Sequence, residues 1–199
     1  MVEHATNPKY QNLLKTGREL FWKHGVKRVT IEEICRESGV SKVTFYRFFP
    51  NKIELAKTIL QGMFDDAMGD YRALMAEDIP FEEKVRKQLL LKFEGTKEIS
   101  AELVRDIYSN QEWGLGAYME ARTEEALQVI MDDYAQAQKK GWIRKDLNLG
   151  FVLYIFHKMP EWIFDQHLLS AYETQQDLIM EIANFFFYGI LPHSKNPND

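Results

Sequence analysis

Residues 30–55 constrain the fold of this chain more than any other stretch, because they spell a helix, a tight turn and a second short helix. Thr30 and Glu33 have the spacing of a capping box, which starts a helix by satisfying its first backbone amides. Gly39 follows where that helix must stop, and glycine accepts the positive φ with which many helices end. Ser41 is a preferred N-cap residue and predicts the start of the next helix.

The second short helix is predicted to have one buried face. Phe45 and Phe49 lie four residues apart, so both fall on the side that ties this helix to its neighbours. Cys35 lies beside Ile34 on the apolar side of the preceding helix, which predicts a packing role for this lone cysteine. Asn51, with an acid three residues later, repeats the cap spacing and opens a longer helix.

A helix-turn-helix places the N-terminal half of its second helix against base edges in the major groove of DNA. Lys42, Val43 and Thr44 are therefore the predicted base-contacting residues. Lysine can donate to guanine, and an apolar or methyl-bearing side chain can contact a thymine methyl group. Arg47, one turn further along, can reach either a phosphate or a base.

Phosphate contacts are predicted at the helix N-termini, where backbone amides and the helix dipole favour an anion. Thr30, Ser41 and Lys52 lie at such termini. For Thr30 and Ser41, capping without a phosphate contact is the alternative, and the two roles can coexist.

The string GVSKVTFYRFFPNKIEL, from Gly39 to Leu55, closely resembles the DNA-binding segment of the TetR family of bacterial transcriptional regulators. The resemblance extends back over Gly25 to a helix that begins near Pro8, whereas the rest of the chain is similar to the family in length and helical layout only. It implies that Tyr46 contacts the DNA backbone. Arg47 departs from the family pattern, which often has a smaller or less charged side chain there.

The resemblance implies an all-α protein in which a three-helix DNA-binding head, residues 1–52, is joined by a long helix to a larger helical body, residues 53–199, for ligand binding and dimerisation. It also implies that a homodimer binds a palindromic operator in double-stranded DNA and represses transcription until a small molecule binds the body. Activation in place of repression, and loss of the ligand response, stay open at this point.

Charge divides the chain in the same way. Residues 1–60 hold 11 Lys and Arg against 6 Asp and Glu, whereas residues 61–199 hold 14 against 24. A basic head on an acidic body fits a nucleic-acid module attached to a part that does not contact nucleic acid. The single cysteine excludes an intrachain disulfide, and no apolar run is long enough for a membrane span, so we expect a cytoplasmic protein without a membrane partner.

Helical periodicity continues through the body. The expected helices cover residues 52–75, 81–95, 97–109, 118–140, 149–169 and 171–191. Pro160 is expected to kink the fifth of these, because proline removes a backbone hydrogen bond. Ser170 and Glu173 have capping-box spacing and are expected to open the last helix. The last two helices are apolar enough to predict a four-helix bundle with a second copy of the chain.

Aromatic and methionine side chains are more numerous in the body than one core needs, and polar groups such as His157 lie among them. That mixture is typical of a small-molecule site, although core packing is the alternative for each residue taken singly. The predicted ligand-contacting residues are Met63, Phe64, Phe93, Tyr108, Trp113, Tyr118, Tyr154, His157 and Trp162. Their chemistry predicts an apolar or amphipathic effector.

Enzyme and cofactor motifs are absent from the sequence. It has no glycine-rich phosphate loop, no Gly-x-Ser-x-Gly motif and no paired-cysteine zinc spacing, so we expect no cofactor, no metal and no catalysis. His157 and Glu161 come nearest to the spacing of a carboxylate-bridged metal centre, and a buried, hydrogen-bonded histidine is the expected alternative. The alternative function is a helical-bundle enzyme or scaffold with an incidental helix-turn-helix-like segment. Binding to short palindromic duplexes would distinguish a DNA-binding regulator from this alternative.

Overall fold

The computed structural model describes residues 6–96, 99–163 and 165–192, except the side chains of residues 89, 92–94, 96 and 160. Over these residues the regular elements are helices and there is no strand, so the predicted all-α class is confirmed. Two compact units form: the first unit is Met1–Ala67 with Glu98–Arg122, and the second unit is Met68–Lys97 with Thr123–Asp199. In the same part of the chain, no helix has both the length and the apolar character that crossing a bilayer requires.

The first unit begins with α1, Pro8–Arg28, which packs against the N-terminal half of α4, Lys52–Ala76. Asn7 caps α1, because its side chain accepts a hydrogen bond from the backbone N–H of Lys9 at 3.0 Å. Gly17 allows the close approach of the two helices, since a Cβ atom there would lie 3.0 Å from side-chain atoms of both Leu55 and Ile59. Gly25 then breaks α1 with a φ of 76°, in the left-handed region that glycine tolerates.

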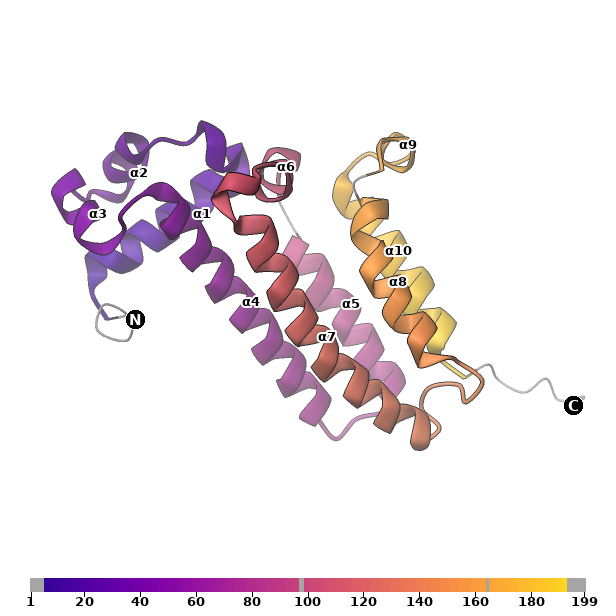
Figure 1. Ribbon diagram of the computed structural model, residues 1–199. Coiled ribbons are helices and arrows are strands. Elements are labelled where there is room, and N and C mark those ends of the chain that lie inside the picture. The colour runs from indigo at the N-terminus through magenta and orange to yellow at the C-terminus, as the bar shows by residue number, and fades with distance from the viewer. Residues whose placement is uncertain (1–5, 97–98, 164, 193–199) are drawn as a thin grey trace, which may run out of the picture. The chain divides into compact units, whose positions relative to one another are not determined.

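Two short helices follow, α2, Ile31–Ser38, and α3, Lys42–Phe48. They lie against each other and against α1, as Figure 1 shows within this unit. Phe45 is fully buried and Phe49 is 3% exposed, which confirms the predicted core face of α3. Cys35 is buried, as predicted.

The first unit is completed by a chain segment that lies far away in sequence. α6, Ala101–Ser109, packs along α1, and the backbone N–H of Ser100 donates to the carbonyl of Trp22 at 3.1 Å. A single turn of 3-10 helix, Gln111–Trp113, leads to α7, Leu115–Lys139. The core of this unit draws on all of these elements and includes Leu13, Phe21, Ile34, Phe45, Leu55, Leu103, Ile107 and Leu115.

α4 and α7 each have residues in both units. In the first unit, the guanidinium of Arg122 on α7 pairs with Asp65 on α4 and lies 4.9 Å from the ring centre of Phe64. In the second unit, the hydroxyl of Tyr71 on α4 donates to the carboxylate of Asp133 on α7 at 3.1 Å. Polar contacts therefore tie the two helices together in each unit.

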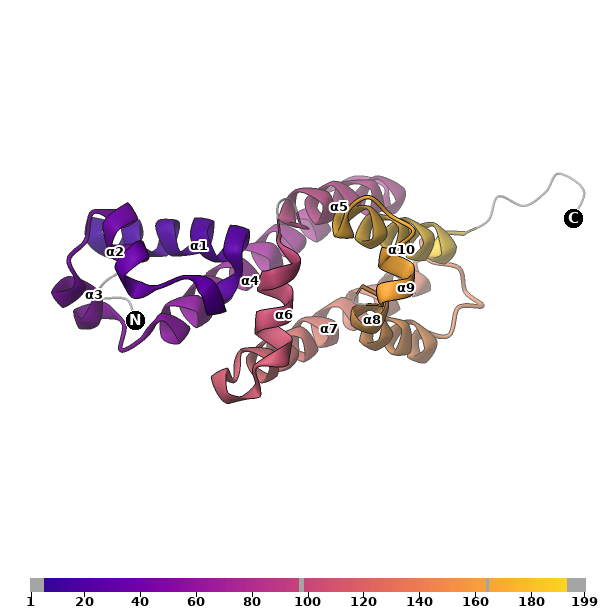
Figure 2. The same cartoon turned by 90° about the horizontal axis from the view of Figure 1, so that it is seen from above.

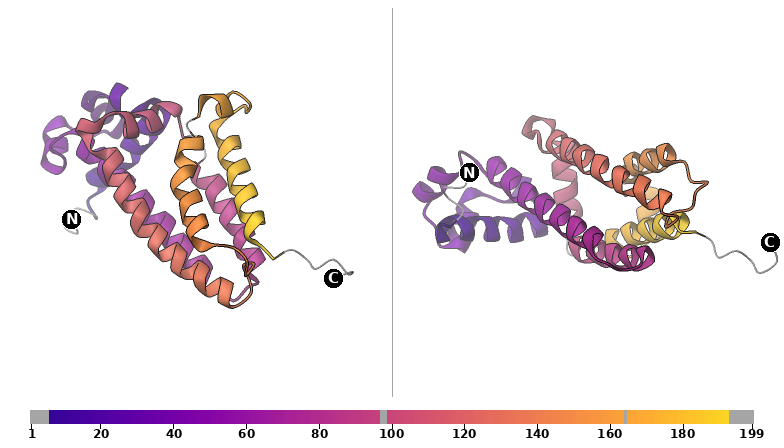
Figure 3. Two further views of the ribbon diagram at one scale, coloured as in Figure 1. Left: turned by 45° about the vertical axis from the view of Figure 1, so that its right-hand side comes forward. Right: turned by 90° about the horizontal axis from the view of Figure 1, so that it is seen from below.

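The second unit adds α5, Phe81–Thr96, α8, Leu149–Ile163, and α10, Gln175–Ile190. α10 packs against both α5 and α8, and Figures 2 and 3 show these three helices side by side. Its core is a separate cluster, which includes Phe81, Val85, Tyr134, Ile143, Val152, Phe186 and Ile190. Tyr134 is almost fully buried in this cluster, and burial raises the pKa of its hydroxyl far above the usual value.

Two expectations about this unit were wrong. The helix expected over residues 149–169 continues through position 160 but ends at Ile163, and a short helix α9, Gln166–Leu169, starts after an Asp165 cap. Ser170 ends α9 instead of opening the last helix. The residue that opens α10 is Thr174, whose hydroxyl oxygen accepts from the amide of Asp177 at 3.2 Å while the Asp177 carboxylate accepts from the amide of Thr174 at 3.0 Å. Elsewhere, the helix expected from residue 97 begins at residue 101.

Candidate DNA-binding interface

The turn between α2 and α3 is built by local interactions. Gly39 adopts a φ of 67°, and the next amide, that of Val40, donates to the carbonyl of Cys35 at 3.0 Å. This arrangement stops α2 in the way that a left-handed glycine cap does. Ser41 then opens α3, since its hydroxyl oxygen accepts from the amide of Thr44 at 3.2 Å. The predicted helix, turn and helix are therefore all present.

The outward side of α3 combines apolar and cationic side chains. Val43 is 75% exposed and Tyr46 is 55% exposed, which is unusual for a valine and a tyrosine on one short helix. Lys42 and Arg47 flank them and are also exposed, and α3 contains no acidic residue. We call these four residues the α3 face. Exposed apolar groups next to cations form a surface that can contact base edges and phosphates of DNA.

Lys42 does not stand alone on this face. Its ammonium pairs with the carboxylate of Glu32 on α2. The hydrogen bond between them raises the pKa of Lys42 and lowers the pKa of Glu32. Both side chains are exposed, so DNA would compete with Glu32 for the ammonium. Glu32 was not identified from the sequence, because ten residues separate the two partners and no helical spacing connects them.

The N-terminus of α2 is exposed at its cap residue, and its first turn carries Glu32 and Glu33. Thr30 is exposed, and its hydroxyl oxygen accepts from the amide of Glu33 at 3.1 Å. That bond satisfies one of the first amides of the helix, and the dipole leaves this end partially positive. The capping role predicted for Thr30 is confirmed, and its phosphate contact stays a prediction.

Lys52 has a different environment from the one expected of a phosphate contact. Its ammonium donates to the carbonyl oxygens of Lys27 at 2.9 Å, in the last turn of α1, and of Val29 at 2.6 Å, at the C-cap of that helix. Partial burial lowers the pKa of Lys52, and the nearby charge of Asp106 opposes that shift. An ammonium has three donors, so one proton remains for a phosphate. The side chain therefore has a structural role that the sequence did not indicate.

The residues predicted to contact a ligand are distributed over both units. In the first unit, Met63 and Trp113 pack against the core, Arg122 covers the ring of Phe64, and Lys57 lies 5.4 Å from the ring centre of Tyr118. Tyr108 is 43% exposed, and burial of its hydroxyl end raises its pKa. In the second unit, Tyr154 is 56% exposed and Trp162 is partly buried. The side chain of Phe93 lies outside the described residues.

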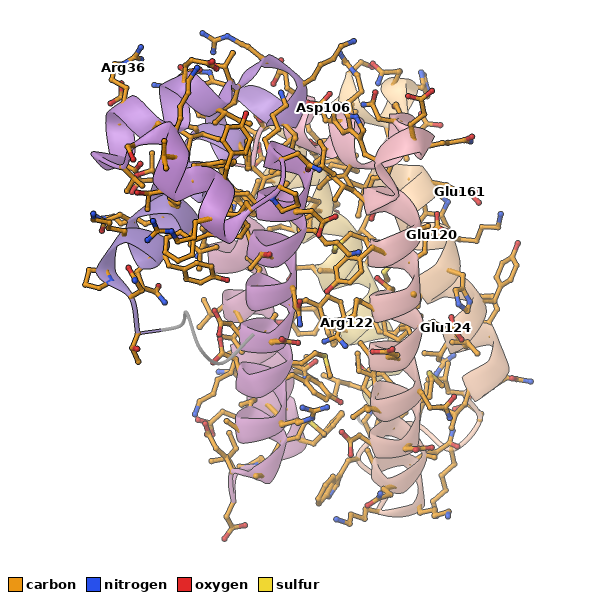
Figure 4. The ribbon with its side chains drawn as sticks, turned by 60° about the vertical axis from the view of Figure 1, so that its left-hand side comes forward. Arg36, Asp106, Glu120, Arg122, Glu124 and Glu161 are labelled. Atoms are coloured by element: carbon orange, nitrogen blue, oxygen red, sulfur yellow. The ribbon has the colours of Figure 1, made fainter. Side chains whose placement is uncertain are left out.

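His157 was expected to be buried, and the structure corrects this. Its side chain is 48% exposed, and its Nε2 lies 2.9 Å from the carboxylate of Glu124 on α7. Glu161 instead accepts from Lys158 at 2.6 Å, so the His157–Glu161 pair that resembled a metal-binding spacing is not formed. Figure 4 shows Glu124 and Glu161 on their two helices. Among the described residues, no group of three or more His, Cys, Asp or Glu is arranged to hold a metal ion.

Comparison with known proteins agrees with this geometry. Residues 13–59 match the sequence model of the N-terminal region of "Bacterial regulatory proteins, tetR family". The chain is 21% identical over 182 residues to the helix-turn-helix transcriptional regulator YdgC of Bacillus subtilis, with 92% of each chain covered.

Two solved structures share the fold over almost the whole length. The fatty acid degradation regulator FadR from Bacillus halodurans superposes with a TM-score of 0.71 at 18% identity, covering 92% of this chain and 97% of that one. The ketosteroid transcriptional regulator KstR2 of Mycobacterium tuberculosis superposes with a TM-score of 0.62 at 19% identity, covering 97% and 100%. At these identities the likeness establishes the fold. The match of residues 13–59, which contain the complete helix-turn-helix, identifies this part of the chain as a DNA-binding segment of the TetR family.

Proposed function

We propose that this protein is a repressor that binds a palindromic operator as a homodimer and leaves it when a small apolar or amphipathic molecule binds. The observation that carries the DNA-binding part is the α3 face, where Val43 and Tyr46 are exposed between Lys42 and Arg47. Repression would follow because a protein bound at an operator blocks access of other proteins to the same DNA. The protein would act in the cytoplasm, where that DNA is.

Each residue of the interface has a proposed role. Lys42, Val43 and Thr44 contact base edges and supply sequence discrimination, since they lie at the N-terminal half of α3. Tyr46 donates its hydroxyl to a phosphate. Arg47 contacts a phosphate or a base. The helix N-termini at Thr30, Ser41 and Lys52 bind phosphates and fix the position of the protein on the duplex.

A homodimer is supported by exposed aromatic side chains on the last two long helices of the second unit. Phe151 on α8 is 57% exposed, and Phe185 and Tyr188 on α10 are 84% and 55% exposed. A stable monomer rarely leaves such side chains in water, and α8 and α10 from two chains can cover them in a four-helix bundle. Tyr154 also lies on α8 and is 56% exposed, so it fits this interface better than a ligand site.

The resemblance to the TetR family also supports a response to a ligand. The aromatic residues of the body support an apolar or amphipathic effector, and so does the likeness to FadR, a fatty acid degradation regulator, and to KstR2, a ketosteroid transcriptional regulator. The effector would have to bind the form that does not bind DNA more tightly than the form that does. About 1.4 kcal/mol of that preference accounts for each tenfold loss of operator affinity. α4 could transmit it, because it begins directly after α3 and extends into the second unit.

Selection of duplexes from a random pool with the purified protein tests the proposal. We expect enrichment of a palindrome whose half-sites lie about one helical turn, or a multiple of it, apart. The enriched duplex should bind in a ratio of two chains to one duplex, measured by light scattering of the complex. A pool that shows no enrichment over repeated rounds would contradict sequence-specific binding. Enrichment of a site without internal symmetry would contradict the homodimer.

A further inference from the structure

The end of α1, beyond the break at Gly25, is held from two sides, and both contacts involve Lys27. Its backbone N–H donates to the Oδ2 atom of Asp106 on α6 at 2.7 Å. Its carbonyl accepts from the ammonium of Lys52 on α4 at 2.9 Å, and the same ammonium donates to the carbonyl of Val29 at 2.6 Å. Asp106 on α6 and Lys52 on α4 thus fix the last turn of α1 and the start of the link to α2. Figure 4 labels Asp106 in this region of the first unit.

Asp106 lies where a carboxylate is unfavourable for its own helix. It is in the last turn of α6, Ala101–Ser109, where the helix dipole repels negative charge. It is only 8% exposed, and a buried charge is costly unless it is paired or hydrogen-bonded. The Lys27 amide and the nearby charge of Lys52 supply that compensation. The Asp106 carboxylate stabilises neither the dipole of α6 nor the apolar core. Its stabilising contact is the hydrogen bond from the Lys27 amide at the end of α1.

The lack of a side chain at Gly25 leaves room for the Asp106 carboxylate. A Cβ atom at this position would lie 2.5 Å from the Oδ2 atom of Asp106, closer than two such atoms can approach. The φ of 76° also restricts the position to glycine. The carboxylate therefore occupies the space that the missing side chain leaves, and the path of the chain from α1 toward α2 depends on it.

Val29 and Thr30 connect the end of α1 to the DNA-binding interface. Val29, whose carbonyl is held by Lys52, directly precedes Thr30, which caps α2. A shift of the Gly25–Val29 segment would therefore move the N-terminus of α2. A helix N-terminus binds a phosphate only when its amides point at it.

We propose that Asp106 is a positioning residue for DNA binding: by accepting the Lys27 amide it fixes the end of α1, and with it the N-terminus of α2, in the orientation that contacts a phosphate. Asp106 itself does not touch DNA. This inference rests on the proposed operator binding, and it adds α6 to the elements on which that binding depends.

Whether DNA affinity rises or falls when the Asp106 carboxylate is removed distinguishes a positioning role from simple repulsion between the carboxylate and DNA phosphates. Removing an acidic side chain should tighten binding to DNA, because the repulsion of phosphates decreases. A positioning role predicts the opposite for Asp106. Glu102 provides the matched control, since it is exposed on the same helix and Glu102→Gln removes one negative charge without touching Lys27.

Three variants are compared on the selected palindrome at a temperature where circular dichroism shows each to be folded. Asp106→Ala should bind about tenfold more weakly, which equals about 1.4 kcal/mol. Asp106→Asn should recover most of that loss, because its amide oxygen can still accept from Lys27, although a neutral acceptor is weaker than a carboxylate. Glu102→Gln should bind as tightly as the wild type or tighter.

Phosphate ethylation interference supplies a readout that lower stability alone would not change. In the wild type, ethylation at the phosphate next to the N-terminus of α2 should reduce binding. In Asp106→Ala that position should lose its effect, while phosphates contacted by α3 keep theirs. If Asp106→Ala does not fold, Asp106→Leu, which also lacks the acceptor for the Lys27 amide, decides by the same two measurements.

The inference is overturned if Asp106→Ala, or Asp106→Leu in its place, binds like Glu102→Gln and keeps the wild-type interference pattern. A wild-type protein that does not distinguish the palindrome from a scrambled duplex would instead contradict the proposed function, before any variant is compared.

Discussion

The α3 face and helix α10 both expose aromatic side chains, yet they differ in charge. On α3, Val43 and Tyr46 lie between two cations and the helix has no acid. On α10, Phe185 and Tyr188 are equally exposed, but the helix carries two acids and no cation. The first combination suits a polyanion, whereas the second suits another apolar surface.

This difference teaches that exposure alone does not identify a partner. A strongly exposed phenylalanine and a strongly exposed valine both indicate a surface that is covered at some stage. The charges around them decide between nucleic acid and protein. Substitutions that change one property at a time can therefore test whether the two surfaces have the separate roles proposed for them.

The largest effect is expected from Phe185→Glu. A charge at the most exposed aromatic residue of α10 should prevent association and yield monomers, because its burial in an interface would desolvate the carboxylate. Operator affinity should fall about 100-fold or more, since linked binding to two half-sites is lost. Light scattering measures the mass, and Leu90→Glu is the control, as Leu90 is 64% exposed on α5. A dimeric Phe185→Glu protein would remove this residue from the interface.

A loss of discrimination is expected from Lys42→Ala. If Lys42 contacts a guanine, the difference in binding free energy between operator and scrambled duplex should shrink by about 1–3 kcal/mol. Lys15→Ala is the control, because it removes the same charge from an exposed position of α1 outside the α3 face. Fluorescence anisotropy with both duplexes gives the ratio. An unchanged ratio would show that Lys42 is not a base-contacting residue.

Tyr46→Phe should weaken binding to every sequence alike. A hydroxyl that donates to a phosphate contributes about 0.5–1.5 kcal/mol and carries no sequence information. Both the operator and the scrambled duplex should therefore lose the same free energy. Tyr172→Phe makes the same chemical change in the second unit and should leave both affinities unaltered. A loss confined to the operator would assign Tyr46 to base contact instead.

The smallest effect is expected from Glu32→Gln. Without its carboxylate partner, the ammonium of Lys42 should be available to any phosphate, so binding should tighten a few-fold on all duplexes and the operator preference should decrease. Glu37→Gln is the control, since Glu37 is on the same helix but pairs with Arg36. Equal behaviour of the two variants would mean that Glu32 acts only through its charge, and not by holding Lys42.

The sequence was most informative where structure is set by neighbours along the chain. Thr30, Gly39, Ser41 and Asn51 each cap or end a helix as predicted, because each interaction joins residues two to five positions apart. The assignment of Phe45 and Phe49 to the core followed from periodicity alone. Local chemistry therefore suffices to predict the helix-turn-helix and the side chains that it exposes.

Where two local patterns compete, the sequence was not enough. Ser170 with Glu173 and Thr174 with Asp177 both have the spacing of a capping box, and only the second pair opens α10. Contacts between distant residues were also missed. The bond from Lys27 to Asp106 spans 79 positions, and nothing in the spacing of either residue indicates it.

The composition of the first unit from two separate stretches of chain limits how its DNA-binding part can be reused. A fragment of residues 1–67 would contain all of the helix-turn-helix but would lack α6. The buried side chains of Leu103 and Ile107 belong to the same core as Phe21, and Asp106 holds the end of α1. A chimera that grafts this operator specificity onto another sensor must therefore carry residues 98–122 as well. Those who exchange such modules should choose junctions within α4 and α7, and not at the end of the helix-turn-helix.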